Sequence, residues 1–445
     1  MRINILFLLF AVVIAQSDNA IITIYKDGTV LVKQPINQTL KKGVNEVYWD
    51  KIPTTIHYDT PFLNISNVSV LSQRYNNKLF SSEDYFEKEK GKTVVIKPKG
   101  RKTITGLLVE ISPSIVSISN RDGLITYNRN EVEFLRGDKI NQKPILKPFL
   151  SWQVKSNKSG NVAGELVYKA NQFSWDTVYR LKMIDETQGE LTAEAIVSNN
   201  TNLDYNNAKM QLVEGNINKL KSNRVYSSKS NVSMVARSMQ EQPQMNRESL
   251  GDYHIYSLND FHNLGSKESV TVRMYGPLQI KYKKTYVFEN SERRQKEEPL
   301  EVEILIENLE DNGLGIPLPD GKVELYQVSN EKGLEFIGAD KMGQVPKGQS
   351  TKIISGRAFD VIGNRKVLNY NRQRKSEEAV IEIKVTNARA KNIDVLLVEH
   401  INGDWIIKDE SFSYKKKDAS TIQFSFVLNG GETKNVYYTY RKEWN

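Results

Sequence analysis

The stretch IITIYKDGTVLV, residues 21–32, indicates the fold class more directly than any other part of the chain. Two runs rich in β-branched and apolar residues, 21–25 and 29–32, flank Asp27-Gly28. An Asp-Gly pair between such runs is the strongest short-range signal for a β-hairpin. The same alternation of apolar and polar residues, bounded by turn residues, recurs along most of the chain. The sequence therefore predicts an all-β protein.

Downstream of the hairpin, five short alternating segments predict a small barrel. They lie at 93–96, 104–110, 115–119, 123–127 and 132–135. This spacing suits an SH3-like or Sm-like β-barrel. Just before them, Ser81, Asp84 three residues later and Gly91 predict one short capped helix.

From residue 149 the expected strands are longer and carry large aromatic residues, which predicts β-sandwich domains. The polar stretch 218–247 interrupts the pattern, and we expect it to be a mobile loop inside one domain. A last series predicts an immunoglobulin-like β-sandwich, with strands at 300–308, 321–328, 351–356, 379–387, 393–400, 421–428 and 433–440. The expected domains are an amino-terminal β domain at 16–80, the small barrel at 81–146, a central β-sandwich at 147–290 and the immunoglobulin-like sandwich at 291–445.

The first fifteen residues predict a secretory signal peptide. Arg2 gives a basic start, residues 5–14 are an apolar run, and Val13 and Ala15 are small residues at the spacing of a cleavage site. The run is too short for a permanent membrane anchor, and no later stretch reaches the roughly 18 apolar residues of a membrane helix. We therefore expect an extracytoplasmic protein, periplasmic or associated with the cell surface of a bacterium, with no transmembrane segment after cleavage.

Composition excludes several kinds of site. The 445 residues include no cysteine, which removes disulfides, thiolate metal ligands and thiol nucleophiles. The formal charge of +9 comes from 62 Lys and Arg against 53 Asp and Glu, mixed along the whole chain. A solvated surface explains this mixture better than a site for anionic envelope polymers, and we expect no nucleic-acid partner.

No catalytic motif stands out. The four histidines, His57, His254, His262 and His400, lie singly, which argues against a metal site. Neither a nucleophile elbow nor a phosphate-binding loop is present. A glycosidase needs only two carboxylates at a fixed separation, so hydrolysis stays open as an alternative.

Aromatic residues are the other candidates for function. The chain has 5 Trp and 21 Tyr, and Trp152, Trp175 and Tyr179 are the obvious members of a sugar-stacking platform. Large aromatic residues in strands more often fill a sandwich core, and we expect that role here.

Four stretches from residue 148 onwards resemble the family called domain of unknown function 4139 (DUF4139). They are PFLSW at 148–152; LVY at 166–168 with FSW at 173–175 and YRL at 179–181; AKMQLVEG at 208–215; and LPDGKV at 318–323 with FIG at 336–338, PKG at 346–348 and GRAFDV at 356–361. GKTV at 91–94 and GLL at 106–108 resemble the amino-terminal half of family members. Members similar to mucoidy inhibitor A carry a long coiled coil that this chain lacks, so the resemblance implies a secreted bacterial type without that coil.

The resemblance implies scaffold roles and supplies no catalytic residue. The family-motif residues are Trp152, Tyr168, Trp175, Tyr179, Gly215, Gly321, Phe359 and Asp360. We expect Trp175 and Tyr179 to fill the central core, Gly215 to end a strand and residues 319–321 to form a turn. Asp360 is expected to accept hydrogen bonds from nearby backbone.

These observations predict a secreted, non-enzymatic, multi-domain β protein of the cell envelope. We expect it to bind or scaffold an envelope protein or glycan, without a cofactor or a metal. The alternative is an envelope glycan hydrolase or carbohydrate-binding protein that uses Asp, Glu and aromatic residues.

Overall fold

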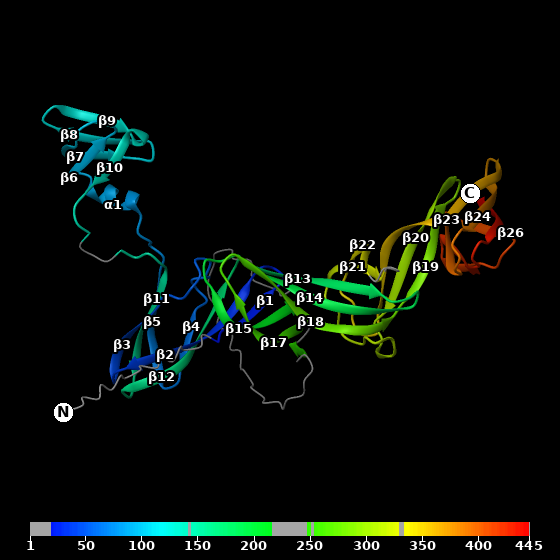
Figure 1. The fold of residues 1–445 in the computed structure, drawn as a ribbon, viewed down its shortest axis with the longest axis horizontal. Coiled ribbons are helices and arrows are strands. Elements are labelled where there is room, and N and C mark those ends of the chain that lie inside the picture. The colour runs from blue at the N-terminus through cyan, green and yellow to red at the C-terminus, as the bar shows by residue number, and fades with distance from the viewer. Residues whose placement is uncertain (1–18, 141–143, 216–246, 251–252, 329–332, 445) are drawn as a thin grey trace, which may run out of the picture.

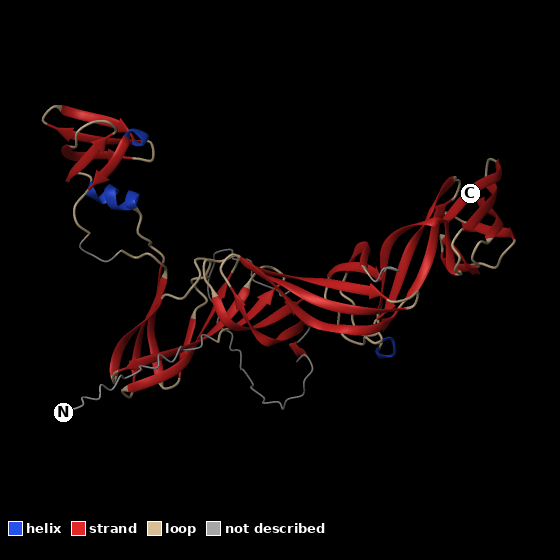
Figure 2. Ribbon diagram, viewed as in Figure 1, coloured by secondary structure: helices blue, strands red, loops and turns tan. Residues whose placement is uncertain are grey.

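The computed structural model describes residues 19–140, 144–215, 247–250, 253–328 and 333–444. Strands dominate an elongated molecule (Figures 1 and 2), so the prediction of an all-β fold is confirmed. Helix in the described part is limited to α1 (Ser82–Glu89) and two 3-10 turns, η1 (Arg129–Glu131) and η2 (Glu310–Asn312). The expected signal peptide at 1–15 lies outside the described residues, as does the expected loop at 218–247 except for its last residue.

A seven-stranded sheet begins with the predicted hairpin. Its order is β16-β17-β15-β1-β2-β12-β4, formed by β1 (Ile21–Tyr25), β2 (Val30–Leu40), β4 (Phe62–Ile65), β12 (Gly160–Ala170), β15 (Tyr205–Glu214), β16 (Arg247–Leu250) and β17 (Tyr253–Leu264). The turn between β1 and β2 needs Gly28, whose φ of +84° is left-handed. β15 and β17 flank the expected loop and pair with each other, so the chain on both sides of that loop belongs to one sheet.

A three-stranded sheet of order β3-β11-β5 lies next in the fold, formed by β3 (Gly43–Trp49), β5 (Val68–Asn76) and β11 (Phe149–Ser156). In both sheets, strands from 16–80 pair with strands from 147–290, and one core contains Ile22, Trp152 and Trp175 together. The domain boundary expected at residue 146 is thus crossed by paired strands. The reason is that the region from α1 to the fifth of the predicted short strands is inserted between β5 and β11, which are themselves neighbours.

The inserted region forms a five-stranded sheet with its own small core. Its order is β10-β6-β7-β8-β9, formed by β6 (Thr93–Pro98), β7 (Ile104–Ile111), β8 (Ile115–Asn120), β9 (Gly123–Asn128) and β10 (Val132–Arg136). Each strand begins at the predicted residue. The predicted helix is also present, and the Ser81 side chain accepts the amides of Glu83 and Asp84 at its start. Figure 1 shows this unit standing away from the rest of the chain.

A second five-stranded sheet has the order β18-β14-β13-β21-β22. Its strands are β13 (Phe173–Met183), β14 (Gln188–Asn199), β18 (Glu268–Lys281), β21 (Gly321–Val328) and β22 (Leu334–Met342). We expected β21 in the last sandwich, but it pairs in parallel with β13. Gly321 permits this close approach, because a Cβ at that position would lie 2.5 Å from the carbonyl oxygen of Thr177.

The carboxy-terminal region is a nine-stranded sheet around a separate core (Figure 1). Its order is β26-β29-β24-β23-β20-β19-β25-β28-β27, formed by β19 (Lys283–Ser291), β20 (Lys296–Glu307), β23 (Ser350–Arg372), β24 (Ser376–Asn387), β25 (Ile393–His400), β26 (Trp405–Glu410), β27 (Lys415–Asp418), β28 (Thr421–Leu428) and β29 (Thr433–Glu443). Only Tyr282 separates β18 from β19, so the two largest parts of the fold are joined by nearly continuous strand.

Candidate functional site

Four of the five aromatic family-motif residues lie in the core. The side chains of Trp152, Tyr168, Trp175 and Tyr179 are all buried. The Nε1 of Trp152 donates to Gln73 Oε1 at 2.6 Å, and the hydroxyl of Tyr179 donates to the Pro319 carbonyl at 2.8 Å. Because these rings are covered, the sugar-stacking platform considered for Trp152, Trp175 and Tyr179 does not lie on the surface.

Several motif stretches meet at one lysine, in a group that we call the Lys26 cluster: Lys26, Trp175, Glu214 and Asp320. The Lys26 Nζ lies 3.9 Å from the centroid of the Trp175 ring, 2.7 Å from Asp320 Oδ1 and 3.5 Å from Glu214 Oε2. Gly215 directly follows Glu214 at the end of β15, and residue 321 directly follows Asp320 at the start of β21. The cluster therefore fastens the seven-stranded sheet to the sheet that contains β13 and β21.

Glu214 gives the cluster a dependence on pH. Burial raises the pKa of its carboxyl, although the charge of Lys26 and a hydrogen bond from Gln344 act in the opposite direction. A carboxyl whose pKa is higher in the folded state binds more protons there than in the unfolded chain. The contribution of Glu214 to stability is then lost as the pH rises from the pKa of the carboxyl in the unfolded chain, near 4.5, through its higher pKa in the folded protein.

We predict that Glu214→Gln makes the protein more stable than the wild type at pH 7 and leaves stability nearly unchanged at pH 4. The neutral amide removes the cost of burying a charge and can still accept a hydrogen bond from Gln344. Urea denaturation of both proteins at the two pH values measures the difference. A variant less stable than the wild type at pH 7 would show that the attraction to Lys26 outweighs the burial of Glu214.

Phe359 and Asp360 differ from the other motif residues because they are exposed. The Phe359 side chain is 87% exposed, in a region of β23 where residues 358–361 have no partner on β20. A bulge of this kind turns side chains away from the regular face of a sheet. The Asp360 backbone carbonyl, rather than its carboxylate, accepts the amide of Ala388 at 2.8 Å.

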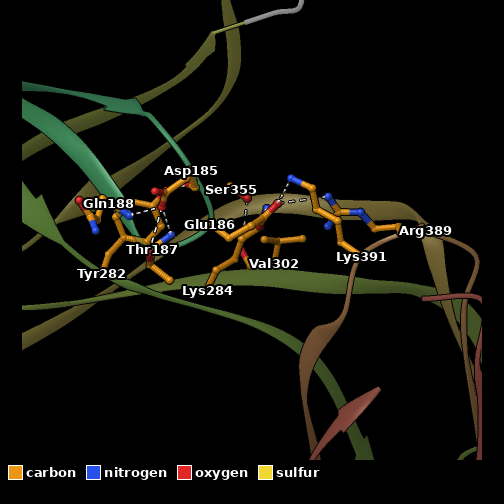
Figure 3. Close-up of polar contacts among 10 residues, drawn as sticks. All are labelled: Asp185, Glu186, Thr187, Gln188, Tyr282, Lys284, Val302, Ser355, Arg389 and Lys391. Carbon is orange, nitrogen blue, oxygen red and sulfur yellow. Dashed lines mark hydrogen bonds and ion pairs between the residues drawn. The ribbon is translucent and has the colours of Figure 1, made fainter. Parts of the chain in front are cut away.

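These two residues lie beside the region that we call the junction site: Glu186, Lys284, Tyr286, Arg389 and Lys391. The tip of the β13–β14 hairpin meets β19 and the loop between β24 and β25 there (Figure 3). Asp185 shapes the hairpin tip, since its Oδ1 accepts the amides of Thr187 and Gln188 at 2.7 and 2.8 Å. These bonds hold the pKa of the Asp185 carboxyl below its usual range.

Glu186 is the single carboxylate at the centre of the junction site. Lys284 Nζ lies 3.0 Å from Glu186 Oε2, while Arg389 Nη2 and Lys391 Nζ lie 3.5 and 3.8 Å from Oε1 (Figure 3). Burial acts to raise the pKa of Glu186, but the hydrogen bond from Lys284 and the three positive charges outweigh it, so the pKa lies below its usual range. Glu186 therefore stays ionised beside three cations, one of which, Lys391, also lowers the pKa of the neighbouring Asp185 carboxyl.

Tyr286 lies between two pockets that open on either side of the junction site. The Lys284 Nζ and the Arg389 guanidinium lie 5.7 and 5.6 Å from the centroid of its ring. One pocket has a volume of about 300 Å³ and includes Asn392 and Asp394; the other has about 190 Å³ and includes Phe359 and Asp360. Lys284 and Tyr286 line both pockets. The arrangement can bind an anionic group next to a ring or an apolar group.

The sequence offers little that would reveal the junction site. Glu186, Lys284 and Arg389 are far apart along the chain, and each is an ordinary charged residue of a turn, a strand or a loop. Phe359, which lies beside the junction site, is the residue there that the sequence does single out, because it belongs to a motif that carries the family resemblance. The family resemblance implies a scaffold role for it instead.

In the part of the chain that the structure describes, no group of three or more His, Asp or Glu residues is arranged to hold a metal ion. No helix among the described residues is long and apolar enough to cross a membrane. No protein-family model matches this chain, and no curated protein matches it. The resemblance to DUF4139 therefore stays a prediction.

Proposed function

We propose that this protein is an extracytoplasmic binding or scaffold protein of a bacterial cell envelope, and that the junction site binds an acidic group of its partner. One observation carries the proposal: three cationic groups lie within 4 Å of the single carboxylate of Glu186, between two open pockets. The non-enzymatic role and the envelope location rest on the sequence alone. The partner is an envelope protein or glycan that carries carboxylate, phosphate or sulfate groups.

The cations of the junction site are the attractive groups in this proposal. Lys284 and Arg389 lie next to the Tyr286 ring, and Lys391 lies beside Glu186 and acts on Asp185. Arg389 offers a planar pair of donors that suits an oxyanion, and Lys391 is largely exposed. Asp360 and Asp394 line the pockets on either side, so an acidic group of the partner is expected to contact Lys284, Arg389 and Lys391 and not these two carboxylates.

A glycan hydrolase is supported less well than a binding protein. Hydrolysis needs a carboxyl group that stays protonated as general acid, and such a group has a raised pKa. Burial acts to raise the pKa of Glu186 and Glu292, but hydrogen bonds from Lys284 and Lys442 outweigh it and hold both below the usual range. A hydrogen bond from Lys296 lowers the pKa of Glu298 in the same way. Glu186, Glu292 and Glu298 are therefore suited to binding rather than to proton donation. Among the described residues, the carboxyl with a raised pKa, that of Glu214, is a buried member of the Lys26 cluster.

We predict that the double variant Lys284→Ala/Arg389→Ala binds an acidic polymer about tenfold more weakly than the wild type. Fluorescence anisotropy with labelled poly-L-glutamate at moderate salt measures the affinity. The expected loss corresponds to about 1.4 kcal/mol, in the range of one charge-assisted contact.

The matched control is Lys352→Ala/Lys408→Ala. It removes the same amount of charge from two other carboxylate-paired lysines, whose partners are Glu303 and Glu378. Equal weakening in both double variants would mean that the polymer responds to net charge, and the proposed site would be wrong.

A further inference from the structure

A separate pocket of about 280 Å³ lies on the nine-stranded sheet, away from the junction site. The turn between β19 and β20, the loop after β25 and the end of β29 meet there. It is lined by Glu292, Arg293, Arg372, Glu377, Asn402, Gly403, Asp404, Lys442, Glu443 and Trp444. Its volume is just below the roughly 300–1,000 Å³ of small-molecule sites, which suits a ligand of about one sugar ring.

Trp444 gives this pocket a partly exposed aromatic surface in a fixed position. Its Nε1 donates to the Arg374 carbonyl at 3.2 Å, and its backbone amide donates to the Lys375 carbonyl at 3.0 Å. The side chain is nevertheless 37% exposed. Because the polar edge of the indole is already bonded, the ring offers apolar surface to a ligand. The Arg372 guanidinium lies 5.8 Å from the ring centroid and lines the same pocket.

Two carboxylates in the pocket are held in place by one lysine. Lys442 Nζ lies 2.5 Å from Glu292 Oε1 and 3.5 Å from Glu377 Oε1. Glu292 Oε1 also accepts the amide of Asn402 at 3.0 Å, and Glu377 Oε2 accepts the hydroxyl of Tyr370 at 3.0 Å. The carboxylates are therefore fixed acceptors beside fixed donors, which is the pattern that ligand hydroxyl groups require.

The lining is close to neutral as a whole. Its residues include four carboxylates and three cations. A pocket with this balance favours an uncharged ligand with many hydroxyl groups over a phosphate, a carboxylate or an ammonium ion.

A buried ion pair supports the turn that carries Glu292, one of the residues that line the pocket. Glu292 has a left-handed backbone with φ of +36°, which is costly for a residue with a side chain. Arg365 holds this turn, since it donates to the Glu292 and Arg294 carbonyls at 2.5 and 2.6 Å. Arg365 is itself paired with Glu399, 2.8 Å away, and both side chains are fully buried. A strained residue held this firmly is typical of binding sites.

We infer that this pocket binds one ring of a neutral oligosaccharide. The apolar face of the sugar lies against Trp444, and its hydroxyl groups bond to Glu292, Glu377 and Arg372. The inference does not depend on the junction site, whose proposed ligand is acidic.

The test is isothermal titration calorimetry of the full chain with three neutral trisaccharides: maltotriose, cellotriose and N-acetylated chitotriose. We expect at least one of the three to bind, and Trp444→Ala to weaken that binding at least tenfold. The matched control is Trp49→Ala. Trp49 also has a lysine 5.8 Å from its ring and an Nε1 bonded to a backbone carbonyl, that of Lys51 at 3.1 Å, but it does not line this pocket.

Two results would overturn the inference: no binding of any of the three trisaccharides, or equal weakening by Trp444→Ala and Trp49→Ala. Circular dichroism of each variant shows whether it is folded. If Trp444→Ala fails to fold, Arg372→Ala replaces it, and the same tenfold loss is expected. The two proposals can fail independently. A protein that binds a trisaccharide but not the acidic polymer would contradict only the proposal for the junction site.

Discussion

Arg365→Met will lower the free energy of unfolding of the nine-stranded sheet by about 3–5 kcal/mol, as removal of one partner from a buried ion pair does. Glu399 would then be left as a buried, unpaired charge. Its Oε2 accepts the Tyr438 hydroxyl at 2.5 Å and its Oε1 accepts Asn290 Nδ2 at 2.8 Å, so two hydrogen bonds remain but no counter-ion. The turn at Glu292 and Arg294 would lose its donor as well.

Hydrogen exchange of the β24 and β29 amides under urea measures this loss, because the separate cores of the molecule need not unfold together. The control is Arg441→Met, which removes an arginine from an exposed pair with Glu443 and should change stability by less than about 1 kcal/mol. Arg365→Met/Glu399→Met should cost less than Arg365→Met alone, since it leaves no unpaired charge. If Arg365→Met and Arg441→Met lower stability equally, the assigned role of Arg365 is wrong.

Trp175→Ala will cost about 3–5 kcal/mol in the central core, as truncation of a buried large aromatic residue does. The Trp175 ring packs 6.3 Å from Tyr256 and lies under the ammonium group of Lys26. Its removal leaves a cavity where two sheets meet and withdraws the surface on which Lys26 rests.

The measurement is the protection of β13 and β14 amides from hydrogen exchange, with Trp49→Ala as the comparison. Trp49 is only partly buried, so its loss should cost clearly less. A Trp175→Ala protein of unchanged stability that has lost affinity for a glycan would contradict the core assignment. In that case the sugar platform considered from the sequence would be right.

Local patterns in the sequence predict the local structure well. The five strands from 93 to 136 and the helix after Ser81 are found at the predicted positions, because each depends on turn residues and alternation over a few neighbours. The parallel pairs β1–β15 and β13–β21 join segments far apart in the chain. Alternation alone does not say which strand is the partner. The expected domains are therefore contiguous stretches of sequence, whereas the sheets combine strands from distant stretches.

The candidate sites were predicted less well, and the reasons differ from residue to residue. Arg365 follows the inward-facing positions Val361 and Gly363 on β23, and Glu399 is buried on β25. A charged residue in a strand is normally assigned to the surface, so only the structure shows that each provides the partner of the other. Phe359 is the opposite case, because an apolar motif residue is assigned to the core and a bulge in β23 exposes it.

The central claim is that the junction site binds an acidic envelope partner, and crosslinking in the cells that produce the protein tests it most directly. A photoreactive residue at Asp394, which lines the larger junction pocket, should capture one recurrent protein or glycan. The adduct should disappear in the Lys284→Ala/Arg389→Ala background and should be absent when the photoreactive residue replaces the exposed Lys417. No adduct from Asp394, or the same adduct from Lys417, would contradict the claim.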